Sequence, residues 1–139
     1  MSNSLVLIDT SIWVPFLRKS PPPAVRDEVD RLLAEDRVAI FPMIRLELLG
    51  GTRSTKEFQR LGSRLDALHQ IPVDEANWGM AAELAFKLRR RGKGVPYTDI
   101  LIGSAAILAD VPLLHADRHF DLMAKDTDLR VRSLVSVVR

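Results

Sequence analysis

Acidic side chains stand at four places in the sequence where an apolar segment gives way to a turn or lies beside a helix start. These residues are Asp9, Glu47, Asp99 and Asp117. Asp9 directly follows an apolar run at residues 5–8, and Asp117 ends the segment "PLLHAD". Carboxylates that meet at one edge repel one another unless a cation shares them, and oxygen ligands suit Mg²⁺ or Mn²⁺. Such a cation can activate water and stabilise charge on a phosphoryl oxygen.

Each acid also has a purely structural interpretation. Asp9 could accept hydrogen bonds from turn amides, and Glu47 could pair with a neighbouring arginine. Asp99 could cap a helix start, where a carboxylate is favoured by a few tenths to about 1 kcal/mol, and Asp117 could be a turn residue. Because the residues around Glu47 are largely apolar, we expect its side chain to be shielded from solvent.

The elements that must position these acids follow from the hydrophobic pattern. Apolar strands are predicted at residues 5–8, 38–41, 71–73, 111–114 and 131–135. Helices are predicted over residues 10–18, 25–35, 42–50, 58–68, 75–91, 100–108 and 120–125. This alternation predicts an α/β fold, a three-layer α/β/α sandwich whose sheet has about five mainly parallel strands with helices on both faces. In such sheets ligands bind beyond the carboxyl ends of the strands, where Asp9 and Asp117 lie.

Several boundaries depend on single residues. Asp74 and Thr98 are predicted to cap the helices that follow them, and Gly92 is predicted to end a long helix. Pro15 is compatible with the first predicted helix only in its first turn, because proline has no N–H to donate.

The composition limits the classes of protein that remain. With 139 residues and 47% hydrophobic content, the chain is long enough for one domain with its own core. It has no cysteine, which excludes disulfides and thiolate sites. A net charge of +2 does not by itself indicate nucleic-acid binding. No apolar run approaches the roughly 20 residues of a membrane span, and no signal peptide is evident, so a cytoplasmic protein is expected.

Four segments together resemble a known family. They are "LVLIDTSIWVPFL", "RLELLGG", "RRRGKGVPYTDILIGSAAI" and "LLHADRHFDLMA". Their types, order and spacing resemble a PIN-domain ribonuclease, specifically the VapC-type toxin of a type II toxin–antitoxin system. The resemblance implies a single PIN domain over residues 1–139.

The resemblance also implies a mechanism and a set of site residues. The catalytic and metal-binding acids would be Asp9, Glu47, Asp99 and Asp117, with Ser11 and Thr10 supporting the first acid. The protein would be an endoribonuclease that depends on Mg²⁺ or Mn²⁺, in which water attacks phosphorus to leave a 5′-phosphate and a 3′-hydroxyl. Its implied partners are an RNA substrate, a cognate VapB-type antitoxin covering the acidic rim, and a second copy in a homodimer.

Two positions depart from the family pattern. His115 stands where relatives often have threonine, and His119 stands where a further acid is common. The fourth acid is therefore either Asp117, which we favour, or Asp121, which otherwise has a supporting role. A zinc site built on the two histidines is not favoured, because no third soft ligand is evident.

The densest basic run has two interpretations of equal weight. It comprises Arg89, Arg90, Arg91 and Lys93. These side chains could be solvated at a helix end or could contact RNA phosphates. Arg18 and Lys19 are weaker candidates for phosphate contact.

Other functions can be weighed against the nuclease. Phosphoacceptor receivers and haloacid-dehalogenase-type phosphatases need a further acid next to or two residues after the first, and Thr10 and Ser11 occupy those places. The remaining alternative is a catalytically silent PIN-fold module that binds RNA or protein.

Overall fold

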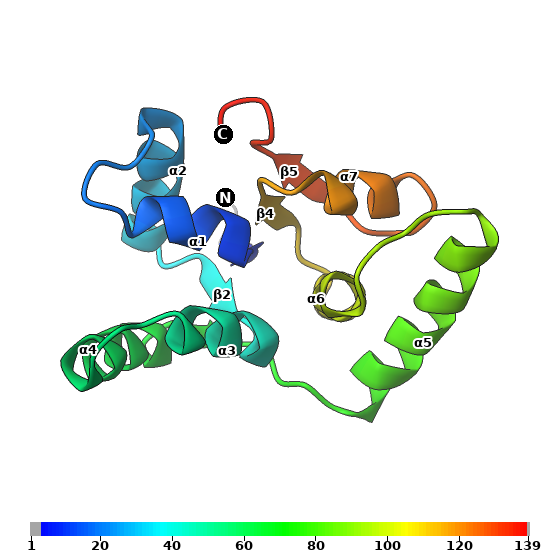
Figure 1. The fold of residues 1–139 in the computed structure, drawn as a ribbon, viewed down its shortest axis with the longest axis horizontal. Coiled ribbons are helices and arrows are strands. Elements are labelled where there is room, and N and C mark those ends of the chain that lie inside the picture. The colour runs from blue at the N-terminus through cyan, green and yellow to red at the C-terminus, as the bar shows by residue number, and fades with distance from the viewer. Residues whose placement is uncertain (1–3, 139) are drawn as a thin grey trace.

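The computed structural model describes residues 4–138, in which five short strands alternate with seven helices (Figure 1). The strands are β1 (Val6–Ile8), β2 (Val38–Ile40), β3 (His69–Gln70), β4 (Leu113–His115) and β5 (Val131–Ser133). The helices are α1 (Thr10–Phe16), α2 (Pro23–Ala34), α3 (Pro42–Gly50), α4 (Thr55–Asp66), α5 (Glu75–Arg90), α6 (Tyr97–Ala109) and α7 (Arg118–Ala124).

All five strands are parallel, in the order β3-β2-β1-β4-β5. Leu7 of β1 lies opposite Ala39 of β2 on one side and Leu113 of β4 on the other. The chain runs outward from β1 to β3 and then returns through α5 and α6 to the other side of β1. The strand order therefore reverses between β1 and β4, and the carboxyl ends of these two strands are where an open α/β sheet places its ligand.

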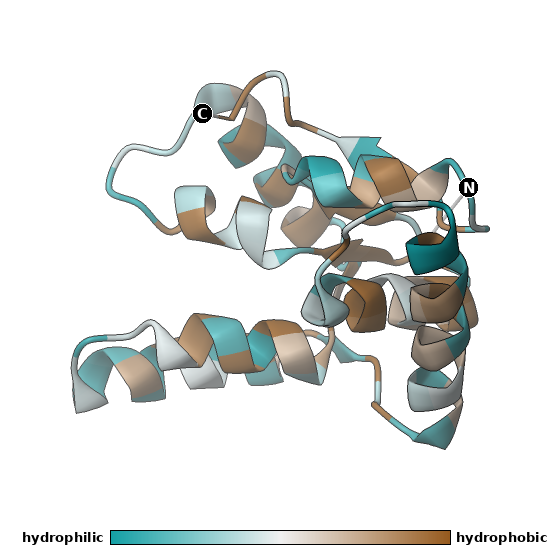
Figure 2. Ribbon diagram, turned by 45° about the vertical axis from the view of Figure 1, so that its right-hand side comes forward, coloured by the Kyte–Doolittle hydropathy of each residue, from teal (hydrophilic) through white to brown (hydrophobic). Residues whose placement is uncertain are grey.

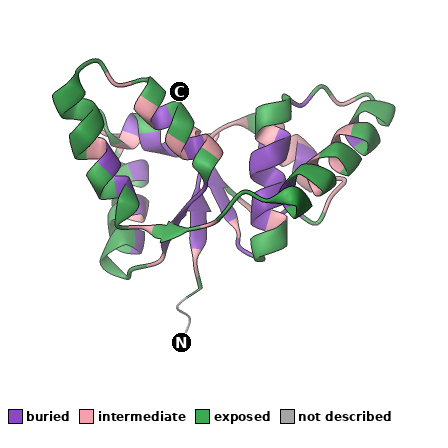
Figure 3. Cartoon of the chain, turned by 90° about the horizontal axis from the view of Figure 1, so that it is seen from below, coloured by how far each residue is buried: buried purple, intermediate pink, exposed green. Residues whose placement is uncertain are grey.

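Burial follows the layers of the sandwich. In Figure 3 the central strands are buried and helices lie on both sides, with their exposed residues turned outward. Every residue of β1, β2 and β4 is buried, which is why these strands are apolar in sequence apart from His115 at the end of β4. The hydropathy colouring agrees, since most helices carry both hydrophilic and hydrophobic residues (Figure 2). The predicted three-layer α/β/α fold is confirmed.

Gly103 lies where α6 packs closely on α7. A Cβ at Gly103 would lie 2.5 Å from Cε of Met123, which is fully buried on α7. Gly103 is four residues after Asp99, so the two lie on the same face of α6. The approach of the helices at Gly103 thus brings Asp99 toward the start of α7.

The third strand lies two residues before its predicted position. β3 consists of the exposed residues His69–Gln70, which pair with β2, and not of residues 71–73. The N–H of Ile71 still donates to the carbonyl of Ile40, at 2.9 Å. Pro72 follows and has no N–H to extend the pairing. Backbone pairing, and not the apolar side chains of residues 71–73, therefore defines this edge strand.

Two predicted helix ends were also wrong. α1 ends at Phe16 instead of residue 18, and Pro15 lies in its second turn and not its first. The missing N–H of Pro15 is tolerated because the helix ends one residue later. α6 begins at Tyr97 after Pro96, without a side-chain cap, so Thr98 does not cap it.

The remaining predicted boundaries are confirmed at Asp74 and Gly92. Asp74 accepts from the N–H of Asn77, and the Asn77 side chain accepts from the N–H of Asp74, forming a capping box. Gly92 ends α5 with a φ of 72°, which glycine adopts without steric cost. Within residues 4–138, no helix is long and apolar enough to cross a membrane.

Candidate metal centre

The structure brings the four predicted acids to one cavity of about 370 Å³ at the carboxyl ends of β1 and β4. The lining side chains are Asp9, Thr10, Ser11, Val14, Pro15, Arg18, Glu47, Asp99, Asp117 and Val138. Each acid comes from a different part of the chain: the end of β1, the middle of α3, the first turn of α6 and the residue before α7. Their meeting is a consequence of the strand order and not of closeness in sequence.

Asp9 is the most rigidly held of the four. Its Oδ2 accepts from the Ser11 N–H at 2.9 Å and from the Ser11 hydroxyl at 2.6 Å, and the side chain is almost fully buried. The Ser11 hydroxyl in turn accepts from the N–H of Ala116, just beyond β4, at 2.9 Å. Ser11 thus fixes the Asp9 carboxylate and ties the end of β1 to the turn that carries Asp117.

Glu47 reaches the cavity from α3 through a contact with Thr10. The Thr10 hydroxyl donates to Oε1 of Glu47 at 2.6 Å, which orients the carboxylate toward the rim. Glu47 is nevertheless exposed, so the expectation that its apolar neighbours shield it was wrong. Ile44 and Leu48 of α3 are buried in the core, while Leu46 is exposed beside Glu47.

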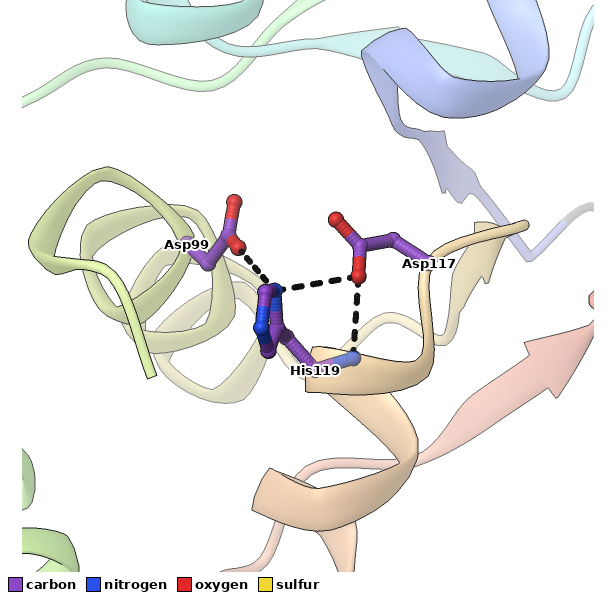
Figure 4. A group of neighbouring side chains, drawn as sticks. All are labelled: Asp99, Asp117 and His119. Carbon is purple, nitrogen blue, oxygen red and sulfur yellow. Dashed lines mark hydrogen bonds and ion pairs between the residues drawn. The ribbon is translucent and has the colours of Figure 1, made fainter. Parts of the chain in front are cut away.

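Two of the cavity acids, Asp99 and Asp117, form a compact group with His119, which does not itself line the cavity (Figure 4). Nδ1 of His119 lies 3.3 Å from Oδ2 of Asp99 and 3.1 Å from Oδ1 of Asp117. One ligand atom from each residue lies within 4.8 Å of the other two. Two carboxylates and one imidazole at this spacing fit a divalent cation. Asp9 and Glu47 line the same cavity but lie outside this compact group.

His119 is the site residue that sequence reasoning did not assign. It was noted as a departure from the family pattern and as part of a zinc site that was not favoured, although its place two residues after Asp117 was visible in "HADRHF". Its closeness to Asp99 could not be seen there, because that contact depends on the packing of α6 against α7.

The electrostatics of the cavity reflect burial and crowding. Burial, with further contributions from Asp117 and Asp9, raises the pKa of Asp99 from 3.8 to about 6. Burial also raises the pKa of Asp9, although the hydrogen bonds from Ser11 oppose that change. Burial and crowding therefore disfavour the negative charge of these acids, as expected of a site whose acids share a cation.

Asp121 points away from the acidic cavity. Its Oδ1 lies 3.1 Å from Nε2 of the fully buried His115, and its Oδ2 accepts from the Ser133 hydroxyl at 3.0 Å. Nδ1 of His115 accepts from the N–H of Asp117, which fixes the neutral tautomer with its proton on Nε2. Burial lowers the pKa of His115. Asp121 and His115 therefore support the turn at Asp117, and neither ring nitrogen of His115 faces the cavity.

The predicted RNA-binding run lies apart from the acids. Arg89 donates to the hydroxyl of Tyr97 at 2.8 Å, and Arg90 stacks over the ring of Phe86. Arg91 and Lys93 both pair with Asp126. Arg18, which was ranked lower from sequence, is the cation that lines the acidic cavity among residues 4–138.

Comparison with known proteins gives the family. Residues 6–126 match the PIN domain family. The chain belongs to the PIN-domain family. Among curated relatives, VapC ribonuclease Mb1587 of Mycobacterium bovis is 34% identical over 133 residues, which is 93% of this chain and 98% of that protein. Ribonuclease VapC18 of Mycobacterium tuberculosis is 30% identical over 128 residues, 86% of this chain and 88% of that protein. The resemblance to VapC ribonucleases is confirmed.

Solved structures agree on the PIN fold. VapBC2 from Rickettsia felis, bound to a DNA fragment from its promoter, has a TM-score of 0.77 at 21% identity and covers 93% of this chain and 98% of that one. DNA-bound VapBC from Salmonella typhimurium has a TM-score of 0.76 at 15% identity, and the match covers 94% of this chain and 98% of that one.

In the absence of divalent metal, replacing Asp99 should stabilise the folded PIN domain. Because the pKa of Asp99 is raised to about 6, the folded chain binds this proton more tightly than the unfolded chain. The free energy of unfolding should therefore fall as pH rises from about 4 to 6. We expect Asp99→Asn to raise it at pH 7.5 in EDTA by roughly 1–3 kcal/mol, measured by urea denaturation. The exposed Asp128→Asn serves as control, and an unchanged or less stable Asp99→Asn would contradict the expectation.

Removing the acceptor of His115 should destabilise the fold. Asp121→Ala leaves the Nε2–H of a fully buried ring without its partner, so the free energy of unfolding should fall by roughly 1–3 kcal/mol. Thermal denaturation of Asp121→Ala beside the exposed Asp128→Ala measures this change. Equal melting temperatures would show that the His115–Asp121 contact contributes nothing.

Proposed function

We propose that this PIN domain is a metal-dependent endoribonuclease that hydrolyses RNA phosphodiester bonds at the acidic cavity. The observation that carries the proposal is the convergence of all four acids, with Ser11 and Thr10 holding two of them. The names of the VapC ribonuclease relatives support the reaction class.

Mg²⁺ or Mn²⁺ is the proposed cofactor. Asp99 and Asp117 would hold it, and Asp9 and Glu47 would complete the acidic surroundings. When bound, the cation lowers the pKa of water and stabilises negative charge on a phosphoryl oxygen.

The side chains of the cavity position the reactants. In the proposed hydrolysis a water oxygen forms a bond to phosphorus, the bond from phosphorus to the 3′-oxygen breaks, and a proton ends on that oxygen. Glu47, exposed at the rim and oriented by Thr10, is placed to take the proton that water loses. Asp9 stays fixed because Ser11 donates to it twice, so the cavity needs little reorganisation when the substrate enters.

The proposed macromolecular partners follow from the same cavity. Solved structures with this fold include VapBC complexes, which supports a cognate VapB-type antitoxin as partner. An open acidic cavity suits a basic side chain from such a partner, because charge-assisted hydrogen bonds to carboxylates are strong. We also propose a homodimer that acts in the cytoplasm. The exposed Trp78 and the small side chains beside it on α5 are available for subunit contact.

Arg18 is the proposed contact for an RNA phosphate near the reacting bond. It is exposed and lines the cavity with the four acids. Residues 89–93 have protein partners, so any contact they make with RNA would lie farther along the strand.

Purified protein should cleave a panel of structured RNAs with Mg²⁺ or Mn²⁺ and lose this activity in EDTA. Asp99→Asn and Asp117→Asn should each lower the rate by roughly 10²-fold or more, while Asp128→Asn keeps it. Binding of RNA by the wild type without cleavage of any panel member would favour the silent PIN-fold module. Cleavage that survives EDTA would exclude the proposed chemistry.

Arg18→Ala should lower kcat/KM for RNA by roughly tenfold, mainly through a higher KM. The slope of the logarithm of the RNA binding constant against the logarithm of salt concentration should become shallower by about 1, as expected for the loss of one phosphate contact. Lys19→Ala is the matched control, since Lys19 is exposed next to Arg18 but does not line the cavity. Equal effects of the two substitutions would point to general charge attraction instead of a positioned contact.

A further inference from the structure

His119 lies between the carboxylates of Asp99 and Asp117. It is the second residue of α7, and its backbone N–H donates to Oδ1 of Asp117 at 2.9 Å. Its ring Nδ1 lies 3.1 Å from that same oxygen and 3.3 Å from Oδ2 of Asp99 (Figure 4). Nδ1 is therefore aimed at the gap between the two acids, while the side chain as a whole is 33% exposed.

The ring nitrogen is close to both oxygens without forming a hydrogen bond to either. Nδ1 is a buried atom with no hydrogen-bond partner within the described part of the chain, although both carboxylate oxygens lie within 3.3 Å. Its direction is aligned with neither oxygen. A buried polar nitrogen without a partner is costly, and such groups in native sites commonly mark a missing ion or water.

The distances from Nδ1 to the two carboxylate oxygens match adjacent corners of a metal coordination sphere. Bonds of about 2.0–2.1 Å at right angles place neighbouring ligand atoms about 2.8–3.0 Å apart. The two distances from Nδ1, 3.1 and 3.3 Å, exceed this by only a few tenths of an ångström. A cation at the shared point would satisfy the orphaned nitrogen and neutralise both acids.

We propose that Nδ1 of His119 is a direct metal ligand beside Asp99 and Asp117, and that it makes the site prefer Mn²⁺ over Mg²⁺. The proposal rests on the proposed function only in taking this cavity as the metal site. Mg²⁺ favours oxygen ligands, whereas an imidazole nitrogen binds first-row transition cations more tightly. Among those cations, Mn²⁺ still accepts a site that is mostly carboxylate.

The same distances are also compatible with a different role for His119. A protonated imidazole could neutralise Asp99 and Asp117 in place of a cation, and metal binding would then expel the ring from the site. The two roles differ in one observable, a bond between the ring nitrogen and the bound metal.

Pulsed electron paramagnetic resonance on the Mn²⁺-loaded full-length chain tests that bond. The wild type should show ¹⁴N modulation from a directly coordinated imidazole. His119→Asp, which offers oxygen instead, and His119→Asn should both lose it. The matched control is His69→Gln, because His69 lies exposed on β3 and contacts Asp36. Circular dichroism and melting temperatures verify that each variant is folded.

Isothermal titration with Mn²⁺ and Mg²⁺ gives a second readout. The preference for Mn²⁺, measured as the Kd for Mg²⁺ divided by the Kd for Mn²⁺, should fall by about tenfold or more in His119→Asp. It should stay unchanged in His69→Gln. Mn²⁺ binding that shows no ¹⁴N modulation, or an unchanged ratio in His119→Asp, would overturn the role of His119 and leave the acidic metal site standing. Failure of the wild type to bind either cation would overturn both proposals.

Discussion

The Ser11 hydroxyl makes the connection on which the arrangement of the acidic cavity depends. It donates to the buried carboxylate of Asp9 and accepts from the N–H of Ala116, so one oxygen joins the ends of two neighbouring parallel strands. The strand order reverses at this place, which opens the sheet edge to a ligand. Without this link, a buried carboxylate with a raised pKa would have little to hold it beside other acids.

The turn that carries Asp117 is also held by hydrogen bonds to a buried polar side chain, His115. His115 replaces a smaller residue of the family pattern, yet its ring is fully buried and both of its nitrogens are engaged. One nitrogen holds the N–H of Asp117, and the other contacts Asp121, which Ser133 of β5 also holds. The turn that presents Asp117 is thus fixed from the side opposite the cavity. The position of Asp117 is thereby coupled to the packing of β4, β5 and α7.

The charge distribution separates the acidic cavity from the basic run. Arg91 and Lys93 pair with Asp126, and Arg89 is held by Tyr97, so these cations stabilise the connection between α5 and α6. Arg18 instead stands at the cavity rim. Arg18 thus lines the same cavity as the acids, which would favour binding of a phosphate there if RNA is the substrate, as proposed.

The sequence by itself determined the fold class, because continuous apolar strands and helical spacing report burial directly, and its resemblance to VapC-type nucleases indicated the four acids. Those patterns located β1 and β2, began β4 two residues too early, and identified Asp74 as a helix cap. They misplaced β3, because its bounds depend on backbone pairing and on Pro72. They also predicted that Glu47 is shielded from solvent, whereas it is exposed. Only the tertiary structure decided that His119 joins Asp99. That contact spans two helices whose approach is set by packing at Gly103, and no periodicity within either helix encodes the distance between them.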